Sequence, residues 1–288
     1  MKLVMLVATR HPVLEAKIIS AYPLDDVHAG SALVAHEGRL LVVQDDAASV
    51  VWVDPLSRRT ERVVLEGKGE QLEKKHKPDF EVAFPGPGPV ITILGSGSAP
   101  NRRRRAVLDV QSNEVRLYDE TRLFEALETA LGAVPNLEGG MIWNDRLRLF
   151  HRGAGPDNSA IVDLHLDVLQ GAAPEIQALT FIDLGTVANR VPLHFTDATT
   201  CDGRLFYVAV AEDTPNAIDD GPVVGAVVGL LDDQGAKWSP LLEPSGEMTT
   251  RKVEGLAYDA LTGWLFGVTD PDDPEKPAEL LRIELTGV

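Results

Sequence analysis

The sequence predicts an all-β fold built from repeated units, and three observations support this prediction. Short runs rich in Val, Leu, Ile and Phe alternate with Gly, Asp, Asn and Pro along the 288 residues, a pattern typical of strands joined by turns. Similar runs recur at nearly even spacing. Helical spacing of apolar residues is confined to Thr121–Leu131, whereas repeated βαβ units would need a helix after nearly every strand.

The repeat consists of five similar runs, and their starts lie 51 to 60 residues apart. They begin at Arg39, Val90, Arg146, Arg204 and Trp264. The interval from the last run through the chain ends to the first is nearly the same. Units of this length that close on themselves are typical of the blades of a β-propeller. We therefore predict a single β-propeller domain over residues 1–288, with five four-stranded blades and a short helical insertion near residues 121–131.

Each blade is expected to begin with an inner strand that precedes the repeated run. These inner strands are predicted at Ser31–Ala35, Glu81–Phe84, Glu138–Trp143, Asp197–Cys201 and Glu254–Tyr258. The fifth blade ends after its third strand, so we expect Ala16–Tyr22 to supply the fourth strand and to cover the exposed sheet edges. Leu3–Ala8 also has the composition of a strand, but no place in this scheme. A sixth, degenerate blade therefore stays open as an alternative.

Charge and composition exclude several classes of protein. The chain carries 44 acidic residues against 27 Lys and Arg, a net charge of −17, which is unsuited to the phosphates of nucleic acids or to an anionic membrane. Residues 211–288 alone contain 16 acidic and 5 basic residues. We find no apolar stretch long enough for a signal peptide or a membrane span, and the one Cys excludes an intramolecular disulfide. We therefore expect a cytoplasmic monomer that binds neither nucleic acid nor membrane.

Strand direction places the start of each inner strand on the face that also holds the loops between second and third strands. The inner strands begin with Ser31, Glu81, Glu138, Asp197 and Glu254. Four carboxylates around the mouth of a central channel would repel one another unless a cation, a basic side chain or shared protons intervened. We therefore predict that Glu81, Glu138, Asp197 and Glu254 bind Ca²⁺ or another divalent cation. Glu81, Glu138 and Glu254 are also the candidate catalytic residues.

Basic residues are predicted on the same face, where they would bind a small anionic ligand or a peptide. The candidate substrate-binding residues are Ser31, Lys77, Arg102, Arg104, Arg152 and Arg251. In the alternative interpretation, these charges neutralise the carboxylates as a solvated rim. Gly95–Ser98 is compatible with phosphate binding but lacks the Lys and the following helix of a phosphate-binding loop, and so is compatible with a simple turn. His28 and His151 are further acid–base candidates.

Three segments resemble the phytase/esterase-like β-propeller proteins, in particular an uncharacterised bacterial branch. They are Lys77–Glu81, Leu94–Ser98 followed by the Arg102–Arg105 run, and Arg251–Ala257. The resemblance implies a calcium-bridged phosphate site on the carboxylate-lined face, with Lys77 and the Arg run near the anion. The chain departs from the family's secreted enzymes because no signal peptide is found, and several phytase ligand loops have no counterpart in it.

Three functions are compatible with these patterns. The first is a metal-assisted hydrolase of a small anionic ester, in particular a phosphoester, in which a divalent cation polarises the substrate and activates water. The second is a non-catalytic propeller scaffold whose loops bind a ligand or a protein. The third is a lactonase-like propeller, which needs His or Asn ligands on inner strands and finds only Asn136 and His194 as candidates.

Overall fold

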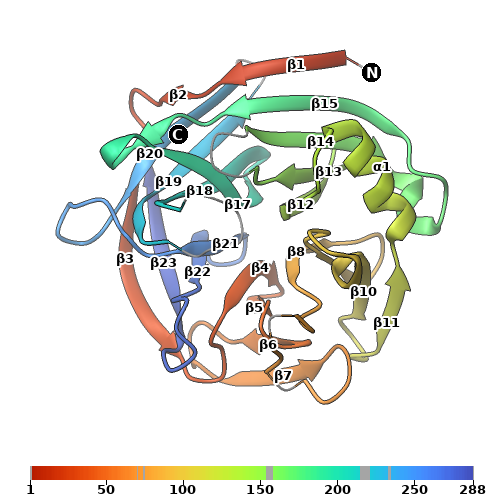
Figure 1. The fold of residues 1–288 in the computed structure, drawn as a ribbon. Helices are drawn as coiled ribbons and strands as arrows, with labels where there is room; N and C mark the ends of the chain where they lie inside the picture. Colours follow the sequence, from red (N-terminus) through yellow and green to blue (C-terminus); the bar gives the residue numbers. More distant parts are fainter. Residues whose placement is uncertain are drawn as a thin grey trace.

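The computed structural model describes residues 2–69, 71–73, 75–153, 158–214, 221–232 and 235–287. These residues form a mostly β structure in four sheets, arranged around a common centre (Figure 1). None of the described helices has the length and apolar character needed to cross a bilayer.

The first two sheets each contain four consecutive antiparallel strands. One consists of β4 (Gly30–His36), β5 (Arg39–Gln44), β6 (Ser49–Val53) and β7 (Thr60–Val64). The other consists of β8 (Phe80–Pro85), β9 (Val90–Gly95), β10 (Arg104–Asp109) and β11 (Val115–Asp119).

The third sheet has five strands, because the N-terminal strand joins its outer edge. It consists of β12 (Leu137–Trp143), β13 (Arg146–His151), β14 (Ser159–His165), β15 (Ile176–Asp183) and β1 (Lys2–Val7). β1 pairs in parallel with β15, so the segment Leu3–Ala8 adds an outer strand to an existing unit. The described residues contain no sixth unit.

The fourth sheet has ten strands, nine of them along its main path, and contains two units of four strands. The first unit consists of β17 (Val191–Cys201), β18 (Arg204–Glu212), β19 (Val223–Asp232) and β20 (Gly235–Leu242). The second consists of β21 (Val253–Asp259), β22 (Trp264–Thr269), β23 (Ala278–Thr286) and β3 (Glu15–Leu24). Two short strands, β16 (Thr186–Val187) and β2 (Thr9–Arg10), pair with β17 and β20.

The N-terminal segment completes the last unit as the sequence predicts. β3, which contains Ala16–Tyr22, pairs antiparallel with β23 from Glu15 to Leu24. β3 also pairs in parallel with the end of β20, so the last two units form one continuous sheet. The prediction of five separate blades in a closed ring therefore stays a prediction.

The first strands of the five units meet at the centre of the molecule. β4 contacts β8, β8 contacts β12, β12 contacts β17, β17 contacts β21, and β21 contacts β4. Glycines allow this close approach. A Cβ atom on Gly139 would lie 3.2 Å from the backbone of Asp197, and one on Gly255 would lie 2.9 Å from the backbone of Ala32 and Leu33. The Glu-Gly pairs that begin two of these strands thus combine a polar side chain with tight strand packing.

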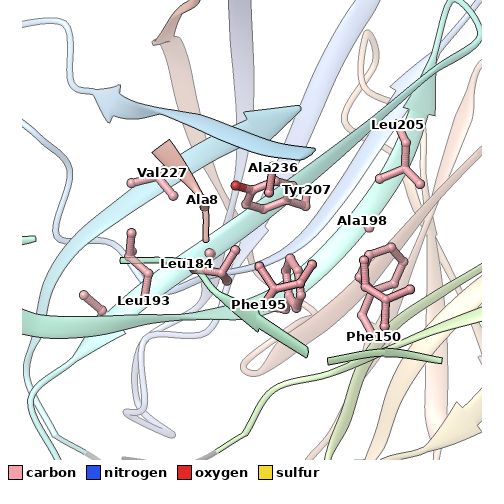
Figure 2. Close-up of a cluster of buried hydrophobic side chains, with 14 of the residues drawn as sticks. Ala8, Phe150, Leu184, Leu193, Phe195, Ala198, Leu205, Tyr207, Val227 and Ala236 are labelled. Atoms are coloured by element: carbon pink, nitrogen blue, oxygen red, sulfur yellow. The ribbon is translucent and has the colours of Figure 1, made fainter. Parts of the chain in front are cut away.

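Apolar side chains fill the space between neighbouring units. Figure 2 shows Phe150, Phe195 and Tyr207 in one such cluster, where Phe195 packs edge-to-face against each of the other two rings with centroids 5.2 Å apart. Edge-to-face contacts of this kind add stability beyond the area that is buried. The cluster joins the third unit to the fourth.

The predicted helix is present as α1 (Thr121–Leu131). Its apolar face buries Leu123, Phe124, Leu127 and Leu131 in a cluster shared by the second and third units. Three short 3₁₀ helices complete the described helices, at Pro100–Arg102, Leu166–Gln170 and Ala188–Arg190.

Candidate functional site

A pocket of about 980 Å³ opens where the first strands of the units begin. Seven of the residues predicted from the sequence line it: Ser31, Lys77, Glu81, Arg102, Glu138, Arg152 and Glu254. The predicted site residues Asp197, Arg104 and Arg251 are not among its lining residues. The acid–base candidates His28 and His151 do line the pocket.

Each first strand has a β-bulge near its start, and four of the five bulged residues, Ser31, Glu81, Glu138 and Glu254, line the pocket. The strand register shifts by one residue at equivalent positions in all five strands, and the residues left unpaired are Ser31, Glu81, Glu138, Thr196 and Glu254. A bulge of this kind re-aims a side chain at the end of a strand. The fourth position in the series is therefore Thr196, where the sequence analysis expects Asp197. Three carboxylates, not four, occupy equivalent positions.

Asp197 lies one residue further along β17, where backbone groups of the fold hold its side chain. Its side chain is buried and accepts hydrogen bonds of 2.7 Å from the backbone N–H groups of Ala198 and Leu256. Burial raises its pKa well above the ordinary value, although these hydrogen bonds oppose the shift. Asp197 thus joins β17 to β21 instead of facing the pocket.

The two hydroxyl residues of the series hold the neighbouring first strands in place. The Ser31 hydroxyl donates to the carbonyl of Phe80 at 2.6 Å, and the Thr196 hydroxyl donates to the carbonyl of Val253 at 2.6 Å. Each carbonyl belongs to the residue directly before a bulged glutamate, Glu81 or Glu254. Ser31 and Thr196 are therefore positioning residues for those two carboxylates. The Ser31 hydroxyl donates its proton to a backbone carbonyl and not to a ligand.

One side of the pocket holds three carboxylates that are close enough to share a metal ion. Oxygen atoms of Asp45, Asp79 and Glu81 all lie within 4.8 Å of one another, and the described residues contain no other such group of His, Cys, Asp and Glu. We call these three residues the acidic triad. Lys77 lies 3.1 Å from Asp45, and Arg102 lies 2.7 Å from Asp79.

Glu81 is the uncompensated member of the acidic triad. Among the described residues, no group forms a hydrogen bond or an ion pair with the Glu81 carboxylate. In contrast, Asp45 and Asp79 each form an ion pair, and Asp79 accepts a further hydrogen bond of 2.5 Å from the Ser96 hydroxyl. Burial and then the charges of Glu138 and Asp79 raise the pKa of Glu81 well above its ordinary value. Burial likewise raises the pKa of Asp45 to about 6, although Lys77 opposes this shift. A bound cation would relieve the same repulsion, since hard oxygen ligands suit Ca²⁺ and Mg²⁺.

The pocket contains a second cluster of charges, which we call the acidic half. It consists of Glu138, Arg152, Glu212, Lys252, Glu254, Asp270 and Asp272, all of which line the pocket. Arg152 lies 2.6 Å from Glu212, 3.5 Å from Glu138 and 4.0 Å from Glu254. Lys252 lies 2.7 Å from Asp272, 3.7 Å from Glu254 and 3.8 Å from Asp270.

Burial also changes the protonation of the acidic half. It raises the pKa of Glu138 to about 8, although the Arg152 charge opposes the shift. It raises the pKa of Asp270 to about 8, although Lys252 opposes that shift. Both side chains therefore carry a proton for much of the time at neutral pH, and Glu138 can act as a proton donor in the pocket.

Three of the four arginines in the run Arg102–Arg105 form ion pairs outside the pocket. Arg103 pairs with Glu128 of α1, Arg104 with Glu66, and Arg105 with Glu120. Arg251 pairs with Glu243 and Glu279. Arg104 and Arg251 are thus held by carboxylates that lie outside the pocket lining, and only Arg102 of the run reaches the site.

Several residues of the pocket were not predicted as site residues from the sequence. Glu212, Lys252, Asp270 and Asp272 lie in the loops and linkers of the predicted face, but nothing in their spacing separates them from other charged loop residues. Asp79 precedes the predicted inner strand by two residues. Its backbone φ of 53° lies in the left-handed region, which Asp tolerates better than most residues. The sequence alone does not predict this backbone conformation.

Two solved enzyme structures are similar to this chain in fold. A glutaminyl cyclase from Myxococcus xanthus has 13% identity and a TM-score of 0.54, with 100% of each chain covered. A PQQ-bound aldose sugar dehydrogenase from Streptomyces coelicolor has 11% identity and a TM-score of 0.54, with 96% of this chain and 100% of that chain covered. At these identities the likeness concerns the fold alone.

Sequence comparison identifies the family. No protein of curated function matches the sequence. A family model matches residues 26–285, which include all five first strands and the whole pocket lining. The chain therefore belongs to DUF6929, a family of unknown function.

Proposed function

We propose that the chain is a single five-bladed β-propeller domain and a metal-assisted hydrolase of a small anionic ester, with a phosphoester as the first substrate class to test. The cyclic contacts of the five first strands and the pairing of β3 with β23 support the propeller. The acidic triad of Asp45, Asp79 and Glu81 is the observation that carries the hydrolase proposal. The resemblance to phytase/esterase-like propellers favours the same chemistry.

Charge explains why a cation would come before an anion at this site. With all groups ionised, the acidic triad together with Lys77 and Arg102 has a net charge of −1, and a divalent cation changes it to +1. An anionic ester would then be attracted to a site that otherwise repels it. The cation supplies Lewis-acid polarisation of the ester and a bound water of lowered pKa.

The residues of the chain have distinct roles in this proposal. Asp45, Asp79 and Glu81 would hold the cation, and Arg102 and Lys77 would bind the anionic group beside it. Glu138 would protonate the leaving oxygen, because its raised pKa of about 8 keeps it protonated at neutral pH.

Cation binding can be tested by calorimetry and by thermal unfolding in Ca²⁺, Mg²⁺, Mn²⁺ and Zn²⁺. We expect at least one of these ions to stabilise the wild type and not Glu81→Gln, and we expect turnover of phosphoesters only in the presence of that ion. Glu125→Gln, on an exposed position of α1, is the matched control. Absence of cation binding, or turnover that Glu81→Gln leaves unchanged, would contradict the proposal.

A non-catalytic binding scaffold is the second candidate, and one observation favours it. Each of the basic side chains that line the pocket, among the described residues, already lies within 3.1 Å of a carboxylate. Such a pocket is neutralised in part without any metal. A ligand that stabilises the protein without being converted would support this candidate. The lactonase-like alternative has both of its candidate residues, Asn136 and His194, on the pocket lining, but neither belongs to the acidic triad.

A further inference from the structure

The acidic half of the pocket contains more carboxylates than its own basic residues can neutralise. Five carboxylates surround the two cations Arg152 and Lys252, and the single ion pairs of 2.6 Å and 2.7 Å use Glu212 and Asp272. The other three carboxylates have only longer contacts with these cations, of 3.5 Å to 4.0 Å. This half therefore has unused capacity to accept hydrogen bonds from a ligand.

Glu254 shows this capacity most clearly. Glu254 is only 4% exposed, and its Oε1 atom is buried without a hydrogen-bond partner. The nearest cations are Lys252 at 3.7 Å and Arg152 at 4.0 Å, beyond hydrogen-bond distance. A buried acceptor without a donor is costly, so such atoms in native proteins call for an explanation. Glu254 lines the pocket, where a ligand can supply the missing donor.

We infer that the acidic half binds an organic cation, the ammonium group of a ligand, with Glu254 as its acceptor. A carboxylate accepts its strongest hydrogen bonds from charged N–H donors. A compact metal ion fits this half less well, because Glu138 and Glu254 belong to no group of three described ligands within 4.8 Å. An anion would meet an excess of negative charge.

An apolar wall of the same pocket suits the rest of such a ligand. The loop after α1 places Ala133, Val134 and Pro135 on the lining, and Pro192 lies on it as well. Val134 is 53% exposed. An alkyl chain attached to the ammonium group could cover this surface and remove it from water.

This inference deepens the proposed function and rests on it for one point, the substrate. If the acidic triad holds the divalent metal ion and the ester, the ammonium group bound in the acidic half belongs to the same substrate. The substrate class is then a small ester that carries an anionic group at one end and an alkylammonium group at the other.

Binding of n-butylammonium chloride to the metal-free full-length protein tests the inference without catalysis. Isothermal titration calorimetry in EDTA would compare it with n-butanol at equal ionic strength. We expect n-butylammonium to bind more tightly than n-butanol, and Glu254→Gln to weaken n-butylammonium binding by about tenfold, as loss of one charge-assisted hydrogen bond implies. Glu247→Gln, on an exposed turn, is the matched control and should bind as the wild type does.

The outcomes separate this inference from the proposed function. Equal binding of n-butylammonium and n-butanol, or unchanged binding by Glu254→Gln, would overturn the ammonium site even if metal ions bind at Glu81. Loss of n-butylammonium binding in Glu254→Gln would support it even if no metal ion binds. If Glu254→Gln does not fold, as judged by circular dichroism, Glu254→Asp takes its place, because the shorter side chain moves the acceptor away from the ligand; the same weakening is expected, and unchanged binding would again overturn the site.

Discussion

At the scale of single residues, the glutamates that begin the first strands were predictable and their register was not. Glu138 and Glu254 are each followed by Gly in a repeated pattern, and the structure shows that both glycines allow a neighbouring strand to approach. A β-bulge adds one residue without leaving a mark in composition. Because side chains alternate between the two faces of a strand, this single residue exchanges the roles of Thr196 and Asp197.

The separate roles of Asp197 and Glu81 give a prediction at this scale. Asp197→Asn should lower the free energy of unfolding by about 1–3 kcal/mol, because an amide cannot accept both backbone N–H groups with the strength of a carboxylate. It should leave the affinity for the divalent cation unchanged, in contrast to Glu81→Gln. Urea unfolding and calorimetry would measure the two quantities. A loss of cation affinity in Asp197→Asn without loss of stability would show that Asp197 is a ligand of the cation and not a structural residue.

At the scale of elements, the strands that complete a periodic unit were predictable. β3 was expected because the last unit lacks a fourth strand, and α1 was expected from helical spacing with the bounds that the structure has. The place of β1 was not predictable, because it pairs in parallel with the outer edge of a unit that is already complete. The partners of Arg103, Arg104 and Arg105 come from other segments, so their positions depend on the assembled fold.

The contribution of β3 can be measured at one buried side chain. Ile18 is 1% exposed and packs in the cluster shared by the last two units. Ile18→Ala should cost about 2–5 kcal/mol of the free energy of unfolding, from lost burial and the cavity left behind. Val13→Ala removes an apolar side chain that is 61% exposed, and should change stability by about 0.5 kcal/mol or less. Equal effects of the two substitutions in chemical denaturation would show that β3 does not hold the last unit together.

At the scale of the whole molecule, the uneven charge of the sequence corresponds to the two charge clusters of the pocket. The acidic C-terminal part, residues 211–288, supplies Glu212, Lys252, Glu254, Asp270 and Asp272 to the acidic half. The first two units supply the acidic triad with Lys77 and Arg102. Charge counts along the chain indicated this polarity. The ion pairs that divide the pocket depend on distances between units, which the sequence does not contain.

The buried carboxylates of the pocket predict that stability falls as pH rises. Glu138 and Asp270 have folded-state pKa values raised to about 8. A carboxyl group with a raised pKa binds its proton more tightly in the folded state, so its contribution is complete below the unfolded pKa and is lost as pH rises through the folded value. The free energy of unfolding of the metal-free protein should therefore decline between about pH 5 and pH 9.

Other carboxylates do not reverse this trend in the same range. Hydrogen bonds from backbone N–H groups lower the pKa of Asp54 and of Asp109, so these groups act in the opposite sense only near and below their ordinary pKa of 3.8.

Urea unfolding in EDTA from pH 5 to pH 9 would measure the decline in the free energy of unfolding. Glu138→Gln, which stays neutral at every pH, should make the slope shallower, whereas Glu125→Gln should leave it as in the wild type. A divalent cation at the acidic triad supplies positive charge that protons no longer supply, so its stabilising effect should grow as pH rises. A stability that is constant or rises over this range would show that these carboxylates are already ionised in the folded protein and that Glu138 is not the proton donor of the site.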